Sequence, residues 1–337
     1  MPTIAVDAMG GDHAPHEIVQ AAAEISRETD IQCVLVGDPA VIQDRLNRLS
    51  YDPARLAVEP ALEAIAMAEE PHAAIRQKRH SSILVATQLV AEGRADAVVT
   101  AGNTGAAVLA CVESFPLIPG VRRSALASVY PRHTEYPGQD QLAMLLDVGA
   151  TTRCDATQLV HFAIMGHGYA QRVSKIAKPK VALLNMGSEA GKGGEVLVEA
   201  HRRLEAVPEM SFIGNIEGHD LVRGKADVIV CEGLLGNVVL KLLEGLAEVV
   251  VDLAGAARRE NWRDKLGFMM LANSLGRLRE MTDYARYGGA PILGFEKLMI
   301  KCHGRSTAAA VKNGIKVAAK AVRDDVAGAI AAAIPRV

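Results

Sequence analysis

Short runs of apolar, often β-branched residues recur along the chain, and most are followed by a polar turn and then an amphipathic segment. The pattern predicts strands at residues 3–6, 33–36, 97–100, 125–130, 142–147, 181–185, 211–214 and 228–231. It predicts helices at 15–29, 82–92, 157–170, 194–206 and 237–257, and one or two closing helices within 306–333. Apolar strands that alternate with amphipathic helices are typical of a parallel sheet covered on both faces. We therefore expect an α/β protein with three layers, α/β/α, and a largely parallel sheet.

Six of the segments that follow a predicted strand are rich in Gly, Asn and Asp. They read DAMGGD (7–12), TAGNTGA (100–106), LDVGA (146–150), LLNMGSEAGKGGE (183–195), GNIEG (214–218) and CEGLLGN (231–237). A glycine that only marks the start of a helix explains some of them. In a parallel sheet, however, the segments after the strands share one edge, and ligands bind there. We expect these six to form a common binding edge.

The chain has no low-complexity linker, so we expect a single α/β/α domain over residues 1–337. Residues 246–284 differ in character from the wound core and are interpreted as a helical hairpin inserted between the last strands.

Composition excludes several classes of protein. The 37 basic residues nearly balance the 39 acidic ones, and aromatic residues make up 4%, so the chain lacks the charge and the stacking side chains of a dedicated nucleic-acid binder. No apolar run reaches the roughly 18 residues of a membrane span. The five cysteines include no C-x-x-C pair, and their odd number argues against a disulfide framework. Without a basic, apolar leader at its start, the chain is expected to be cytoplasmic.

The standard catalytic motifs are absent from the sequence: there is no G-x-G-x-x-G after the first strand, no Walker loop and no G-x-S-x-G elbow. The best local set of metal ligands is Asp12, His13, His16 and Glu17. Two histidines three residues apart at a helix start are more often capping positions, so we expect no metal.

What remains suits a small anion, because glycine-rich turns before helices present backbone N–H groups and the positive end of the helix dipole. Lys192, in a loop with several glycines, adds a cation, although an isolated loop lysine is more often simply solvated. Asn185, Asn215 and Asn237 each close a strand or open a helix, where they either cap the backbone or bind a ligand. The residues alone predict a site for phosphate or a carboxylate and leave the reaction open.

The same segments, taken in order, carry a resemblance. DAMGGD, AGNTGA, LDVGA, LLNMGSE with GKG, FIGNIEG, the run from 227 to 241, YGGAPILG (287–294) and a late HG (303–304) resemble the acyl-[acyl-carrier-protein]:phosphate acyltransferase family of bacterial phospholipid synthesis. The match extends over almost the whole chain. DAMGGD and YGGAP together are far more specific than any single glycine-rich loop.

The resemblance implies a fold related to isocitrate and isopropylmalate dehydrogenases and to phosphate acetyltransferase, usually as a homodimer. It implies that orthophosphate attacks the thioester of a long-chain acyl carrier protein, giving acyl phosphate and free carrier, with no cofactor. It also implies peripheral association with the inner face of the membrane, where a glycerol-3-phosphate acyltransferase consumes the product.

By position in the family motifs, the resemblance assigns the catalytic residues Lys192, Asn237 and His303. Lys192 would hold the phosphate or offset charge on the thioester oxygen, Asn237 would donate to that oxygen, and His303 would carry a proton. The substrate-binding residues that it implies are Asp7, Gly10, Gly11, Asp12, Ser82, Asn103, Thr104, Gly105, Asn185, Asn215 and Gly236.

The predicted hairpin fits a membrane role. Between residues 258 and 279 six basic residues accompany two acids and several large apolar side chains, as an interfacial helix requires. The alternative is a helix pair that forms a dimer or packs in the core. The residues expected to contact the membrane are Arg258, Arg259, Trp262, Arg263, Phe268 and Met269.

Some positions depart from the family pattern: GLLGN (233–237) replaces an aromatic-Thr version, Glu232 stands for Asp, GATTRC (149–154) replaces a GAN-type turn, and GRS (304–306) replaces GSS. Leu235 removes a hydroxyl beside the expected oxyanion donor. Two rival functions stay open. One is a metal-dependent, NAD-linked β-decarboxylating dehydrogenase, and the other is a non-catalytic membrane scaffold that binds the carrier protein.

Overall fold

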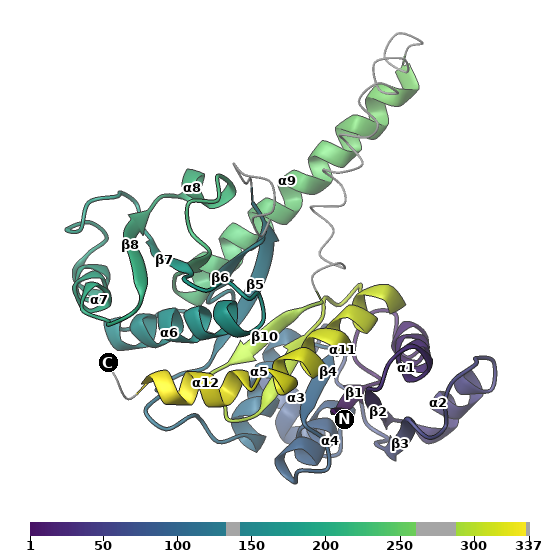
Figure 1. The fold of residues 1–337 in the computed structure, drawn as a ribbon. Coiled ribbons are helices and arrows are strands. Elements are labelled where there is room, and N and C mark those ends of the chain that lie inside the picture. The colour runs from purple at the N-terminus through teal and green to yellow at the C-terminus, as the bar shows by residue number, and fades with distance from the viewer. Residues whose placement is uncertain (133–141, 261–287, 335–337) are drawn as a thin grey trace.

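A computed structural model of the chain describes residues 1–132, 142–260 and 288–334. Its strands form one eleven-stranded sheet in the order β3-β2-β1-β4-β11-β10-β5-β6-β9-β7-β8 (Figure 1). The strands are β1 (Thr3–Asp7), β2 (Gln32–Gly37), β3 (Leu56–Pro60), β4 (Ala97–Thr100), β5 (Ala125–Pro131), β6 (Leu142–Leu146), β7 (Lys180–Leu184), β8 (Ser211–Ile216), β9 (Val228–Val230), β10 (Ala290–Leu293) and β11 (Leu298–Lys301).

Helices cover both faces of this sheet. They are α1 (His16–Glu28), α2 (Pro39–Leu46), α3 (Pro71–Gln77), α4 (Ser82–Ala91), α5 (Thr104–Ser114), α6 (Ala156–Arg172), α7 (Glu195–Glu205), α8 (Gly218–Val222), α9 (Gly233–Glu260), α11 (Ala308–Arg323) and α12 (Val326–Ala333). Alternate residues of β1 enter different cores, Ile4 and Val6 on one face and Ala5 on the other. The first core includes α1, α6, α11 and α12, and the second includes α3, α4 and α5. The predicted three-layer α/β/α architecture is confirmed.

The sheet consists of two parallel halves that run in opposite directions. We call β3, β2, β1, β4 and β11 the first half-sheet and β6, β9, β7 and β8 the second half-sheet. Between them, β10 is antiparallel to β11 and to β5, and β5 is antiparallel to β6. The carboxyl ends of the two halves therefore face opposite ways. The expectation that all six polar segments share one edge is wrong, because the reversal through β10 and β5 separates them.

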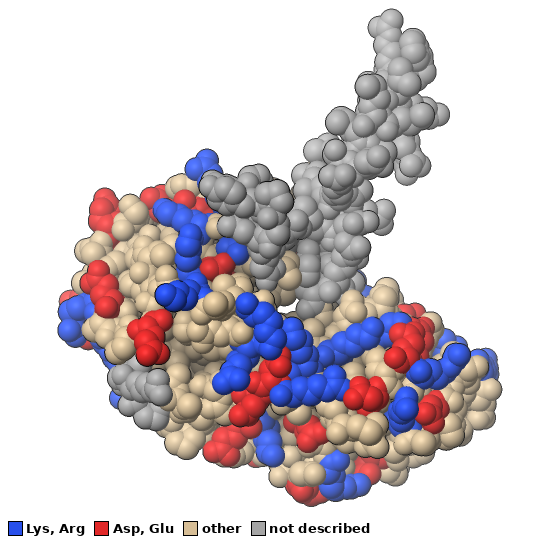
Figure 2. All heavy atoms as spheres, in the orientation of Figure 1, with Lys and Arg blue, Asp and Glu red and all other residues tan. Residues whose placement is uncertain are grey.

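Ion pairs attach α11 to α1 across the first face. Lys312 Nζ lies 2.7 Å from Glu24 Oε2, and Arg323 lies 2.5 Å from Asp30 Oδ1. Figure 2 shows both signs of charge interspersed over the viewed face of the molecule. Ion pairs at the surface contribute little to stability, so the buried apolar face of α11, which includes Val311, Ile315 and Ala318, holds the helix in place.

The predicted helices are present, with two boundaries displaced near the polar segments. Helix α9 begins at Gly233 rather than at residue 237, so most of the CEGLLGN segment is its first turn. Strand β8 continues to Ile216, which places Asn215 within a strand. The short elements β3, β10, β11, α2, α3, α5 and α8 were not predicted, because runs of four to eleven residues leave little periodic signal.

The predicted hairpin at 246–284 falls largely outside the described residues. Residues 246–260 continue α9, a helix that projects from the body of the molecule in Figure 1, and Arg258 and Arg259 lie at its end. Trp262, Arg263, Phe268 and Met269 lie outside the described residues. The hairpin and the single-domain organisation stay predictions. Within residues 1–132, 142–260 and 288–334, no helix combines the length and apolarity needed to cross a membrane.

Candidate active site

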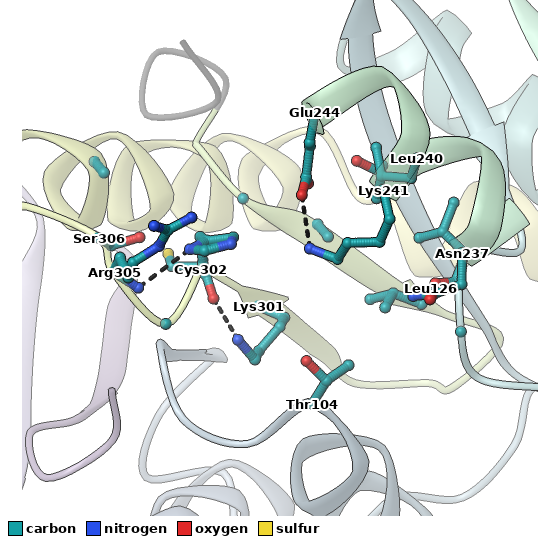
Figure 3. Close-up of a pocket in the computed structure, with 18 of the residues that line it drawn as sticks. Thr104, Leu126, Asn237, Leu240, Lys241, Glu244, Lys301, Cys302, Arg305 and Ser306 are labelled. Atoms are coloured by element: carbon teal, nitrogen blue, oxygen red, sulfur yellow. Dashed lines mark hydrogen bonds and ion pairs between the residues drawn. The ribbon is translucent and has the colours of Figure 1, made fainter. Parts of the chain in front are cut away.

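A cavity of about 460 Å³ lies where the two half-sheets meet. Its walls come from the carboxyl end of β11, from β5, from the start of α5 and from the first half of α9 (Figure 3). One part of the lining is apolar and includes Met67, Leu126, Val148 and Leu240. The polar part includes Asp12, Thr104, Asn237, Lys241, Glu244, Lys301, His303 and Arg305. The cavity thus joins a cationic wall to an apolar one.

Lys301, the last residue of β11, is the buried cation of this cavity, with 6% of its surface exposed. Its ammonium group donates to the carbonyl oxygen of Cys302 and, at 3.4 Å, to that of Ala101. Burial disfavours the charged form and lowers the pKa of Lys301 to about 8. Lys301 was not among the site residues predicted from the sequence. The signal that could have found it is a lysine at the end of the apolar run LMIK, separated by one residue from the HG motif.

His303 also lines the cavity, and its Nδ1 accepts a hydrogen bond from the backbone N–H of Arg305 at 3.1 Å. Partial burial lowers the pKa of His303, and the positive charge of Lys241 adds to the effect. At neutral pH the ring is therefore mainly uncharged. Two further cations at the cavity are already paired, Lys241 with Glu244 at 2.6 Å and Arg305 with Glu248 at 3.4 Å.

Asn237 reaches the cavity from the first turn of α9, and its Nδ2 donates to the carbonyl oxygen of Val148 at 3.1 Å. The helix approaches this closely because residue 236 is a glycine. A Cβ atom on Gly236 would lie 1.8 Å from the carbonyl oxygen of Asp147. Gly236 is thus required for packing and brings Asn237 to the cavity.

The turn beside Asn237 is organised by Asp147, which is fully buried. Its carboxylate accepts hydrogen bonds from the backbone N–H groups of Leu126 at 2.9 Å, Ala150 at 3.0 Å and Thr151 at 2.8 Å. These bonds fix β5 against the LDVGA turn. Asp147 was not among the predicted site residues, although the motif containing it was.

Asp7 holds together the polar segments of the first half-sheet without lining the cavity. Its carboxylate accepts hydrogen bonds from Ser82 Oγ at 2.6 Å and Thr100 Oγ1 at 2.7 Å. A Cβ on Gly10 would lie 2.3 Å from Asp7 Oδ2, so Gly10 makes room for the carboxylate. Burial raises the pKa of Asp7. In the structure Asp7, Ser82 and Gly10 are supporting residues.

Asn103 caps the amino-terminal end of α5. Its Oδ1 accepts from the N–H of Ala106 at 3.1 Å, and its Nδ2 donates to the carbonyl oxygens of Met67 and Glu69. This cap places Thr104 and Gly105 in the cavity wall. Nearby, Gly11 has a positive φ of 111°, and the next residue, Asp12, lines the cavity and donates its N–H to the carbonyl oxygen of Gly304 at 2.8 Å.

Lys192 is exposed on the loop after β7, and it is not among the residues that line the cavity. Two predicted binding residues hold this loop. Asn185 Nδ2 donates to the carbonyl oxygen of Lys192 at 2.9 Å, and Asn215 Nδ2 donates to that of Glu189 at 2.8 Å. The structure therefore brings Asn237, His303, Asp12, Thr104 and Gly105 together, and it places Lys192, Asn185 and Asn215 at the far end of the second half-sheet.

A metal site was not expected from the sequence. In the part of the chain that the structure describes, no group of three or more His, Cys, Asp or Glu side chains is arranged to hold a metal ion.

With the geometry in place, the chain can be compared with known proteins. A family model described as "Fatty acid synthesis protein" matches residues 2–329. A phosphate acyltransferase from Heliobacterium modesticaldum is 44% identical over 333 residues, which cover 98% of this chain and 97% of that protein. The chain belongs to the phosphate acyltransferase family. It is thus an enzyme of the acyltransferase class, and the resemblance noted in its sequence is confirmed.

Solved structures show the same fold at low sequence identity. A phosphotransacetylase from Streptococcus pyogenes superimposes with a TM-score of 0.63 at 17% identity, covering 98% of this chain and 94% of that one. A 4-hydroxythreonine-4-phosphate dehydrogenase from Klebsiella pneumoniae has a TM-score of 0.51 at 16% identity, covering 96% and 98%. The predicted relation to both a phosphate acetyltransferase and a dehydrogenase fold is confirmed.

Proposed function

We propose that this acyltransferase moves the long-chain acyl group of an acyl carrier protein thioester to orthophosphate, giving acyl phosphate and free carrier. The observation that supports the proposal is the cavity itself. It sets a buried ammonium, an imidazole and a carboxamide beside an apolar wall. An acyl thioester needs the carboxamide and the wall, and a charged phosphate needs a site with positive charge.

The reaction needs positioning and charge stabilisation more than a strong base, because phosphate is already a charged nucleophile. A phosphate oxygen attacks the thioester carbonyl carbon, the C–O bond forms, and the carbonyl oxygen becomes an oxyanion. Asn237 donates a hydrogen bond to that oxyanion. The C–S bond then breaks, and His303, uncharged at the start, accepts the proton of the attacking hydrogen phosphate and passes it to the departing sulfur.

Lys192 remains a proposed catalytic residue on the strength of the family motif. Since its side chain is exposed outside the cavity lining, its part in the reaction requires the loop after β7 to move toward the substrate.

The decisive experiment incubates the purified protein with palmitoyl-carrier protein, with and without orthophosphate, and follows the release of free carrier. We expect release only with orthophosphate, in excess chelator and without added nucleotide. Loss of release in chelator would favour the metal-dependent dehydrogenase. Liposome binding with no thioester consumed in any condition would favour a non-catalytic scaffold.

We further propose that the enzyme is a cytoplasmic homodimer. Helix α9 carries a stripe of exposed apolar side chains on one face, at intervals of three or four residues, and a partner helix would cover it. The stripe comprises Leu234, Val238, Leu242, Leu246 and Val249.

The distal end of α9 and the residues beyond it are proposed to contact the inner face of the membrane. The basic and apolar composition of residues 258–279 supports this. A membrane position would deliver the unstable acyl phosphate directly to a glycerol-3-phosphate acyltransferase.

A further inference from the structure

Lys301 is the most buried charged group of the cavity, and the mechanism above gives it no task. We propose that Lys301, together with the amino-terminal turn of α5, binds the attacking orthophosphate. The inference rests on the proposed function and identifies the binding site of its nucleophile, orthophosphate.

The first observation is the placement of the ammonium group. It donates hydrogen bonds to two backbone carbonyl oxygens, those of Ala101 and Cys302, which are dipoles rather than counter-charges. The buried carboxylate in its surroundings, Asp7, is already bound to Ser82 and Thr100. A buried cation without a directly bonded carboxylate is costly unless an anion joins it. A phosphate in the cavity would supply that charge.

The second observation is the start of α5, an eleven-residue helix whose first two residues line the same cavity. Asn103 takes up the N–H of Ala106, whereas the N–H groups of Thr104 and Gly105 have no acceptor within the helix. Figure 3 shows Thr104 beside Lys301. The two elements are joined through the sheet, because Thr100 of β4 pairs with Lys301 of β11. An ammonium group and the amino-terminal turn of a helix thus line the same cavity, and both favour a bound phosphate.

The third observation is what lies opposite. In Figure 3 Asn237 lies on the α9 side of the cavity, away from Lys301, and Leu126 lies between them. A phosphate on Lys301 would therefore face a thioester whose carbonyl oxygen is held by Asn237. Nucleophile and oxyanion donor then approach the carbonyl carbon from different walls, as an addition reaction needs.

The charge on Lys301 depends on its neighbours from every side. Cys302, Asp7 and Asp12 favour the ammonium, and Lys241 of α9 opposes it. Burial outweighs them and lowers the pKa of Lys301 to about 8. A bound phosphate would raise that pKa. Free enzyme should thus lose affinity for phosphate as the pH rises through about 8, where phosphate itself stays dianionic.

The kinetic test compares Lys301→Met with the wild type, using orthophosphate and palmitoyl-carrier protein as varied substrates. We expect the KM for orthophosphate to rise about tenfold or more, and the KM for the carrier substrate to stay within about twofold. Lys297→Met is the matched control, because Lys297 lies just before the other end of β11 and does not line the cavity. A folded Lys301→Met enzyme with the wild-type KM for orthophosphate would overturn the inference.

The pH profile separates binding from a structural role. In the wild type the KM for orthophosphate should rise above pH 8, and in Lys301→Arg this rise should disappear up to pH 9, since arginine keeps its charge. A wild-type KM that does not change between pH 7 and 9 contradicts the proposal.

A binding measurement keeps the inference independent of activity and of variants that fail to fold. Wild-type protein with ¹³C-labelled lysine is titrated with pH and followed by NMR, without carrier protein. Orthophosphate should raise the pKa of Lys301, so that its acid dissociation constant falls by about tenfold or more. If orthophosphate left the pKa of Lys301 unchanged, the proposed phosphate site would be refuted even in an active enzyme. If the pKa changed but no carrier protein were released in the activity assay, the proposed reaction would be refuted and the phosphate site would stand.

Discussion

Gly236 has no side chain, and this lets helix α9 pack close enough to the LDVGA turn to form the active site. Any β-carbon there would collide with the carbonyl oxygen of Asp147, which belongs to the backbone and cannot turn aside. The contact brings the first turn of α9 onto the LDVGA turn and carries Asn237 into the cavity. A helix interior usually disfavours glycine, so its presence here reflects the close approach.

We predict that Gly236→Ala lowers the free energy of unfolding by about 1–3 kcal/mol, because helix and turn must separate. Urea denaturation followed by circular dichroism measures this. Gly245→Ala is the matched control in the same helix, where a Cβ would meet no atom within 4 Å. It should leave stability unchanged or raise it by about 0.5–1 kcal/mol. Equal effects of the two substitutions would contradict the packing argument.

For catalysis, Asn237→Ala and Lys192→Ala are each expected to lower turnover about 100-fold or more without unfolding the protein, the usual loss for an oxyanion or anion donor. Single-turnover release of carrier protein is the measurement, and Asn47→Ala, on the exposed end of α2, is the control. Near-normal turnover in both variants would remove this assignment.

Among the secondary-structure elements, the loop after β7 shows how the asparagines act at a distance from the cavity. Asn185 holds one part of the loop through Lys192, and Asn215 holds another through Glu189. Asn215 is itself fixed by His201, whose Nδ1 lies 3.0 Å from Asn215 Oδ1. The asparagines thus set the position of the loop that carries Lys192.

We therefore predict that Asn185→Ala and Asn215→Ala each speed hydrogen exchange in residues 187–194, because loop carbonyls lose their donors. Mass spectrometry of peptic fragments can follow this, with residues 301–306 as an internal reference that should not change. If exchange in 187–194 stayed at the wild-type rate, the two side chains would not be holding the loop.

The sequence predicted the long elements well and the short ones poorly. The β1 and β4 strands are apolar and isolated between turns, so their pattern is clear. The β11 strand is as short as β4, but it has a single β-branched residue and ends in a lysine, and so neither the strand nor Lys301 was found. The relative direction of the strands could not be predicted from the sequence either. The antiparallel pairing of β5 with β6 and β10 depends on residues far apart in the chain.

For the whole molecule, family resemblance supplied the chemistry but not the place where it occurs. Motif order brought Lys192 and Asn237 together as catalytic partners. Both follow strands of the second half-sheet, but only Asn237 lines the cavity. The cavity takes Lys301 from the first half-sheet and Asn237 from the helix that follows the second. Because the site is assembled from both half-sheets, no single segment of the sequence contains a motif that identifies it.

The exposed stripe on α9 gives a prediction for assembly. Leu242→Glu and Leu246→Glu should each shift a dimer toward monomer, because a charge would be buried in an apolar contact. Sedimentation velocity over a range of concentrations measures the change. Val222→Glu, an equally apolar exposed position on α8, is the control and should leave the mass unchanged. A wild-type protein that is monomeric at every concentration would exclude the dimer.

Helix α9 has one more mechanical consequence. Its 28 residues make it about 42 Å long, and its first turn is locked against Asp147 while its last turn is far from the body. The helix also contacts the body farther along, through Leu243 and the Glu248–Arg305 ion pair, so the part free to tilt begins beyond residue 248. The remaining residues, 249–260, span about 18 Å, and a tilt of about 10° there would carry the tip through about 3 Å while Asn237 stays in place. The carboxyl end of α9 could therefore adjust to a surface that is not flat while the residues of the active site keep their positions.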